Sequence, residues 1–132
     1  MVGLLEFFPS VNDNERYVQI IAPWFLNMLN KMSNSKTSAG VRKIDVFDKA
    51  SKAHLEGFRG DKKQFENYVG KRGSKVYSDL IDMIVDSLVD KGFVRRAVNT
   101  AEIMITQGGI NMCDTKGETG WHASDYSVDY VC

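Results

Sequence analysis

The chain has 132 residues, 26% of them charged, and no net formal charge at pH 7. This length predicts a single domain that buries about two-thirds of its unfolded surface, and the composition excludes an intrinsically disordered chain. No apolar run reaches the ~18 residues of a membrane-spanning helix, and the N-terminus lacks the pattern of a signal peptide. Two cysteines are too few for a disulfide scaffold. We therefore expect a cytoplasmic protein with no membrane partner.

The first periodic segment predicts a helix over residues 15–32, capped by Asp13 or Asn14. Pro23 lies inside this segment and predicts a kink or a new helix start there. The density of aromatic and methionine side chains is more typical of a core than of a binding groove. If this surface were exposed it would be a partner site, because large apolar patches rarely face water.

Residues 39–57 predict a second helix, and a short third helix is expected between Asp61 and Gly70. The most strongly patterned stretch follows. It begins at Ser74, which is suited to cap a helix, and ends at Gly92, which is suited to the left-handed position after one. Its apolar residues cover a wide arc, so we expect a central helix, or an edge helix that also packs against a partner chain.

Four aspartates share the remaining face of this long helix, and we call them the aspartate row: Asp79, Asp82, Asp86 and Asp90. A solvated helix face is the interpretation we favour for them. Two alternatives stay open: the row could bind a protein partner, or it could imitate phosphates as small viral inhibitors do. Dedicated mimics are usually far more acidic overall, so the second alternative is the weaker one.

After Gly92 the pattern changes from helix to strand. Residues 93–98 and 101–106 flank an Asn99-Thr100 turn pair and predict a β-hairpin. Helix, glycine, strand, turn and strand is the order of a winged helix-turn-helix. The stretch Leu88-Val89-Asp90-Lys91-Gly92-Phe93-Val94-Arg95-Arg96 resembles the end of the third helix and the start of the wing in that family. Ile105-Thr106-Gln107-Gly108-Gly109-Ile110 resembles the returning strand and the turn after it.

The resemblance covers about residues 40–110 and implies a mainly α fold with a small β-hairpin, in the α+β class. Within the single domain of residues 1–132, it implies a winged-helix-like core at residues 39–110. An extra helical segment at residues 1–32 precedes this core. The family usually continues with another helix, whereas residues 111–132 are rich in Gly and Asp and predict an irregular acidic arm.

Charge is distributed unevenly along the chain. Residues 1–30 hold one basic and three acidic residues (−2), residues 31–75 hold twelve and five (+7), and residues 76–132 hold four and nine (−5). In a winged helix, the turn before the third helix and the wing approach nucleic-acid phosphates. The resemblance therefore implies phosphate contacts through Lys71, Arg72, Lys75, Arg95 and Arg96, with the surface extended by Arg42 and Lys43.

Two functions remain open. The first is a non-catalytic binding module in a regulatory or nucleoprotein role, with DNA favoured over RNA. The aspartate row argues against it, because a recognition helix turns its exposed side to the bases of a polyanion. The second is a protein-interaction or assembly subunit, including a viral inhibitor, that uses the apolar excess of the helices at residues 15–32 and 76–90. It would form a homo-oligomer or a heteromeric complex. The +7 segment favours the first slightly.

No motif with catalytic or cofactor-binding specificity occurs. Cys113, His122 and Cys132 lack the paired-cysteine spacing of a zinc site, and their order says nothing about a nucleophile and base in space. His54 has no second histidine at metalloprotease spacing, and the glycine turns lack the Lys-Ser/Thr ending of a phosphate loop. We therefore expect no enzyme activity, no cofactor and no metal site.

Overall fold

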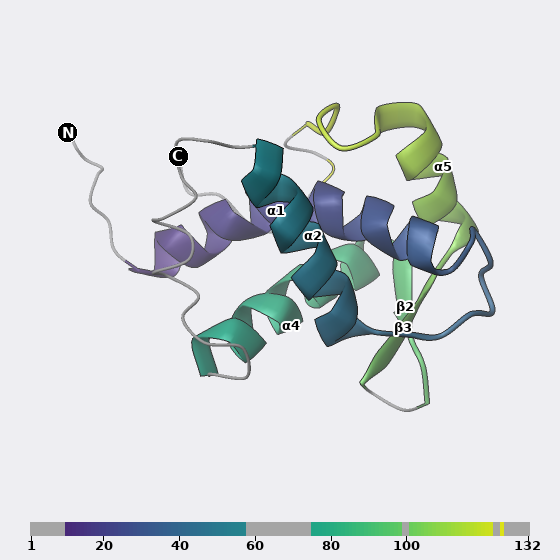
Figure 1. Cartoon of the computed structure of the whole chain (residues 1–132), viewed down its shortest axis with the longest axis horizontal. Helices are drawn as coiled ribbons and strands as arrows, with labels where there is room; N and C mark the ends of the chain where they lie inside the picture. Colours follow the sequence, from purple (N-terminus) through teal and green to yellow (C-terminus); the bar gives the residue numbers. More distant parts are fainter. Residues whose placement is uncertain (1–9, 58–74, 99–100, 123–124, 126–132) are drawn as a thin grey trace.

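The fold is mainly helical with one small antiparallel sheet, which confirms the α+β class (Figure 1). The computed structural model describes residues 10–57, 75–98, 101–122 and 125. The elements in chain order are α1 (Ser10–Met32), β1 (Val41–Arg42), α2 (Lys43–Gly57), α4 (Lys75–Asp90), β2 (Val94–Arg96), β3 (Glu102–Ile105) and α5 (Gln107–Lys116). The helix expected between Asp61 and Gly70, the cap at Ser74 and the Asn99-Thr100 turn lie outside the described residues.

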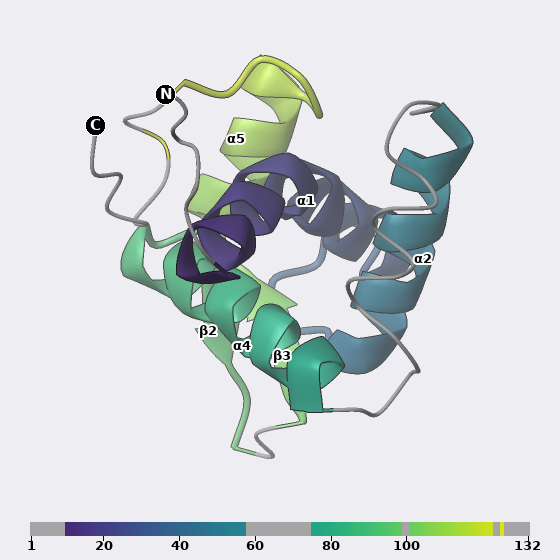
Figure 2. The ribbon, with the colours of Figure 1, turned by 90° about the vertical axis from the view of Figure 1, so that its left-hand side faces the viewer.

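Helix α1 is the centre of the fold, and α2, α4, α5 and β3 all pack against it (Figures 1 and 2). Within residues 18–33, only Lys31 is exposed, and Phe25, Leu26 and Leu29 are completely buried. The expectation that this aromatic segment forms core is confirmed. Within residues 18–32, the apolar side chains of α1 are buried or half-buried by the elements around them.

Helix α4 is therefore an outer helix, so the alternative of a central helix is wrong, and the alternative of an edge helix that packs against a partner chain stays a prediction. Its apolar side, which includes Leu80, Ile84 and Leu88, is buried against α1, α2 and β2. The opposite side, with the whole aspartate row, is exposed. The wide apolar arc of this helix predicted more burial than the structure shows, because Val76 is part of the arc and is 44% exposed.

Helix α1 runs without interruption through Pro23 and begins at Ser10 rather than Glu15. The alternative of a new helix start at Pro23 is therefore wrong. A proline removes one backbone hydrogen bond from a helix, but Pro23 is buried in the segment that the other elements surround, and this packing outweighs the local loss. The Asn27 side-chain amide donates to the Pro23 carbonyl and to the Gly117 carbonyl, both at 2.8 Å, and so ties α1 to the end of α5.

The predicted hairpin is part of a three-stranded sheet with the order β1-β3-β2. Residues 41 and 42, which the sequence predicted as helix, form strand β1 and pair with β3. The antiparallel register places Val41 opposite Ile103, Arg42 opposite Glu102, Val94 opposite Ile105, Arg95 opposite Met104 and Arg96 opposite Ile103. A two-residue strand is too short to show a period of its own, so only the pairing with a distant strand reveals it.

Gly92 ends α4 as predicted, with a φ of +81°. The Gly92 amide donates to the Val89 carbonyl and the Phe93 amide to the Leu88 carbonyl, both at 3.0 Å. These two bonds satisfy carbonyls at the helix end and turn the chain directly into β2.

Residues 107–116 form helix α5, so the predicted turn at Gly108-Gly109 and the irregular arm from residue 111 are wrong for this part of the chain. Thr106 caps the helix: its hydroxyl accepts from the Gly109 amide at 3.0 Å and donates to the Gly92 carbonyl at 2.5 Å. The two glycines lower the local helix propensity. The cap and the packing on β3 and α1 outweigh that deficit.

The chain after α5 packs back on the fold. The Trp121 indole donates to the Gly117 carbonyl at 3.1 Å and meets the Phe93 ring edge to face, with centroids 5.7 Å apart. Beyond it, the Lys116 ammonium lies 2.7 Å from the Asp125 carboxylate, which also accepts from the His122 amide at 2.8 Å. These contacts attach the described residues after α5 to α5 itself and to Phe93.

The Asp125 contacts lead to a pH-dependent expectation. Burial acts to raise the pKa of Asp125, but the hydrogen bond from the His122 amide and the Lys116 ion pair outweigh it and lower the pKa below the ordinary 3.8. The ionised carboxylate therefore stabilises the fold above the unfolded-state pKa, and this contribution is lost as the pH falls through the lower folded-state pKa. We expect Asp125→Asn to destabilise the protein at pH 7 and to lose that effect near pH 2.

Urea denaturation of both proteins at pH 7 and at pH 2 measures this difference. Asp114→Asn, which removes an exposed carboxylate from α5, is the control and should change stability little at either pH. An equal effect of Asp125→Asn at the two pH values would show that the carboxylate charge is not what stabilises this region.

Candidate functional site

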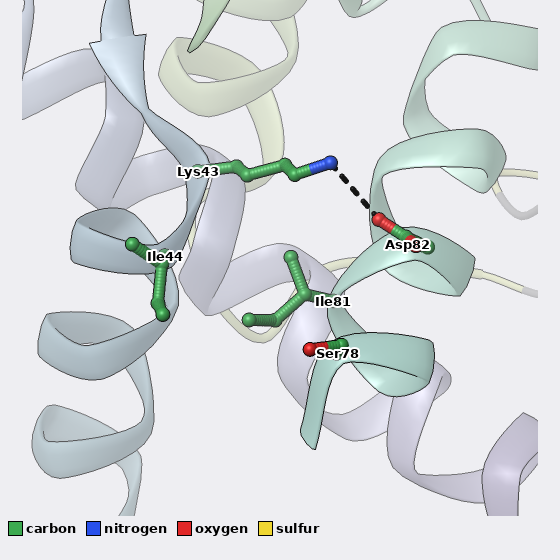
Figure 3. Close-up of a pocket in the computed structure, with 5 residues that line it drawn as sticks. All are labelled: Lys43, Ile44, Ser78, Ile81 and Asp82. Atoms are coloured by element: carbon green, nitrogen blue, oxygen red, sulfur yellow. Dashed lines mark hydrogen bonds and ion pairs between the residues drawn. The ribbon is translucent and has the colours of Figure 1, made fainter. Parts of the chain in front are cut away.

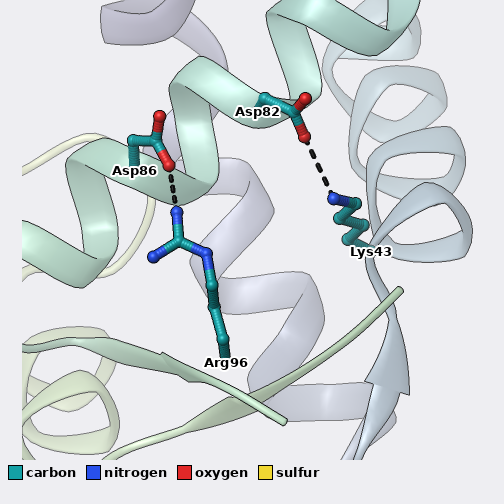
Figure 4. Close-up of polar contacts among 4 residues, drawn as sticks. All are labelled: Lys43, Asp82, Asp86 and Arg96. Atoms are coloured by element: carbon teal, nitrogen blue, oxygen red, sulfur yellow. Dashed lines mark hydrogen bonds and ion pairs between the residues drawn. The ribbon is translucent and has the colours of Figure 1, made fainter. Parts of the chain in front are cut away.

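The aspartate row is exposed as predicted, and three of its four carboxylates form ion pairs. Asp79 pairs with Lys75 at 2.9 Å, Asp82 pairs with Lys43 at 3.0 Å, and Asp86 pairs with Arg96. Figure 4 shows the last two pairs, in which cations from the start of α2 and from β2 reach the same face of α4. The row therefore joins three elements at the surface.

These ion pairs occupy part of the basic site that the sequence predicted. Lys43, Lys75 and Arg96 are three of the cations expected to contact phosphate, and each lies against a carboxylate of α4. Such exposed ion pairs stabilise a fold by only about 0–1 kcal/mol, so their main effect is to neutralise charge. Part of each candidate set, which the sequence presented as rival sites, thus lies on one shared surface of α4.

Arg95 and Arg96 are neighbours in the sequence but act on opposite faces of β2, because side chains alternate along a strand. Arg96 is opposite the buried Ile103 and turns toward α4, whereas Arg95 is opposite Met104 on the other side of the sheet. There the Arg95 guanidinium donates to the Thr37 carbonyl at 3.3 Å. The two arginines, which the sequence grouped in one basic site, therefore point to opposite faces of the sheet.

The register gathers Arg42, Glu102, Met104 and Arg95 on one side of the sheet, which we call the outer sheet face. Arg42 and Arg95 are exposed, and Glu102 is half-buried beside Gly40. Arg42 lies 3.9 Å from Asp45, at the limit of an ion pair, and Arg95 binds the neutral Thr37 carbonyl. Neither cation is paired as closely with a carboxylate as the three that lie against α4. Lys71 and Arg72, the other predicted contacts, lie outside the described residues.

A shallow cleft of about 260 Å³ separates the start of α2 from α4. It is lined by Ile44, Ser78 and Ile81 together with the Lys43–Asp82 ion pair (Figure 3). Ligand pockets usually enclose about 300–1,000 Å³ and present several convergent polar groups. This cleft is smaller and open, so we do not assign it a small-molecule ligand.

Cys113 is buried, and burial together with the negative charges of Asp114 and Glu118 raises its pKa to about 12. A thiol in this state is a poor nucleophile and a poor metal ligand at neutral pH. Within the described ranges, no group of three or more His, Cys, Asp or Glu side chains is placed to hold a metal ion. Cys132 lies outside these ranges. In the same part of the chain, no helix combines the length and apolar character needed to cross a membrane.

Comparison of the chain with models of known protein families, with characterised proteins and with solved structures finds no match. The helices and the three-stranded antiparallel sheet are compatible with a winged-helix-like fold. Any function must therefore be argued from the surface of this chain.

Proposed function

We propose that this chain is a non-catalytic, winged-helix-like binding module that contacts nucleic-acid phosphates through the outer sheet face. The observation that supports this is the register of the sheet, which places exposed Arg42 and Arg95 on the same side, on the two strands that flank β3. Arginine contacts to phosphate supply affinity that does not depend on sequence. The exposed Lys36, next to the Thr37 carbonyl that Arg95 binds, adds positive charge beside this face.

The proposal places the nucleic acid against the sheet rather than along α4. A recognition helix lies in the major groove with its exposed side toward the bases. On α4 that side carries the aspartate row, and carboxylates next to a polyanion oppose binding. Duplex DNA is the partner that we favour, in a regulatory or nucleoprotein role in the cytoplasm.

Fluorescence anisotropy of random-sequence duplex DNA, measured across a salt series, tests this function. We expect binding to weaken steeply with salt, and the R42A/R95A variant to bind all sequences more weakly. Loss of two phosphate contacts should reduce the slope of log K against log salt by about 1.8, since each contact contributes about 0.9.

The matched control is K49A/K52A, which removes two exposed cations from α2 and changes the net charge equally. It should lower affinity slightly and leave the slope close to that of the wild type. If both double variants lose binding to the same extent, the outer sheet face is not the contact surface and the assignment is wrong.

A protein partner is the second candidate, and the exposed side of α4 favours it. Val76 and Val98 are the large apolar side chains that the described structure exposes, and Val76 lies on the same side of α4 as Asp79. An apolar residue beside carboxylates fits a basic protein surface. Two results together would favour this function instead. The first is that the protein does not bind DNA at low salt. The second is that the wild type captures a protein from cell extract that the D79N/D82N/D86N variant does not capture.

A further inference from the structure

We propose that Asp82 and Asp86 of α4 form an autoinhibitory contact: they take the place of phosphates and keep Lys43 and Arg96 from binding nucleic acid. This inference rests on the proposed function and adds that the contact weakens nucleic-acid binding.

The two ion pairs hold cations from two separate elements against α4. Lys43 directly follows Arg42 at the end of β1, and Arg96 directly follows Arg95 in β2. Unlike these two arginines, Lys43 and Arg96 lie against α4, where Asp82 and Asp86 hold them away from the outer sheet face. The two carboxylates are one helical turn apart on α4 and receive these cations from two different elements (Figure 4). The unneutralised basic surface is therefore limited to the outer sheet face, although Lys43 and Arg96 could enlarge it if they were released.

Both ion pairs are in contact with water. The side chains are 30% exposed at Lys43, 56% at Asp82, 44% at Arg96 and 62% at Asp86. Pairs in contact with water are weak, so the cations are not locked in place. A phosphate that approaches Lys43 or Arg96 replaces an anion already present and is repelled by the carboxylate it displaces. These two cations therefore contribute little to binding in the wild type.

Exposed carboxylates of this kind contribute little to the stability of a fold. Beneath them, α4 is held by a buried apolar side that includes Leu80, Ile84 and Leu88. Replacement of Asp82 and Asp86 by asparagine should therefore release the cations and leave the helix in place.

The test compares D82N/D86N with D90N/D114N in the same anisotropy titration of random duplex DNA. Asp90 and Asp114 are exposed aspartates, so the control changes the net charge equally. We expect D82N/D86N to bind more tightly and to increase the salt slope by about 1.8, which corresponds to two new phosphate contacts. The control should raise affinity only through its net charge and keep the wild-type slope.

A second pair of variants assigns the gain to the released cations. K43A/R96A should change binding little in the wild-type background but remove the whole gain in the D82N/D86N background. Thermal unfolding verifies that each variant is folded, and the single variants Asp82→Asn and Asp86→Asn should each give about half of the slope change. A D82N/D86N slope equal to that of the control, or a gain that survives K43A/R96A, would overturn the inference.

The outcomes separate this inference from the proposed function. If R42A/R95A binds like the wild type, the proposed function fails. If R42A/R95A loses binding while D82N/D86N behaves like its control, only the autoinhibitory contact fails.

Discussion

Replacement of Gly109 by alanine should lower the free energy of unfolding by about 3 kcal/mol or more, at the upper end of what overpacking costs. A Cβ atom at this position would lie 2.2 Å from the Phe93 carbonyl oxygen and 2.8 Å from Cγ1 of Ile105. The Phe93 carbonyl is backbone and accepts a 3.0 Å hydrogen bond from the Thr106 amide, so it cannot move away without disrupting that bond at the end of the β2–β3 pair. The close approach of α5 to the sheet thus requires a glycine.

Gly108→Ala is the matched control, one residue earlier in the same helix. A Cβ atom there would meet the Gly92 carbonyl oxygen at 3.3 Å and Oγ1 of Thr106 at 3.5 Å, and the position is exposed. Alanine favours a helix over glycine by about 1 kcal/mol, so this variant should be neutral or slightly more stable. Urea denaturation measures both variants. Equal stability of the two would show that α5 does not pack this closely on Phe93.

Phe25→Ala should also destabilise the protein strongly, by about 3–5 kcal/mol. Phe25 is completely buried in α1, the helix that α2, α4, α5 and β3 surround, so the lost ring would leave a cavity in the middle of the core. Val98→Ala is the control, because Val98 is fully exposed and its truncation should change stability by less than about 0.5 kcal/mol. Chemical denaturation of the two variants provides the comparison. A small effect at Phe25 would mean that α1 is not the central helix.

The sequence alone determined the elements whose signals are local. Helical periodicity identified α4, and Gly92 marked its end because the left-handed position after a helix favours glycine. The same periodicity placed the aspartate row on the exposed side of α4. The change to strand alternation after Gly92 identified β2 and β3. These predictions hold because each depends on residues within a few positions of one another.

Only the tertiary structure decided which helix is central, that residues 107–116 form α5, and that residues 41–42 form a strand. It also decided the candidate site. Lys43, Arg96 and the aspartate row come from separate elements, and the sequence carries no signal that they meet. The alternation of side chains along β2 then separates Arg95 from Arg96. Ion pairs and sheet faces arise from contacts between distant segments, so a count of charges along the chain does not reveal which cations remain available.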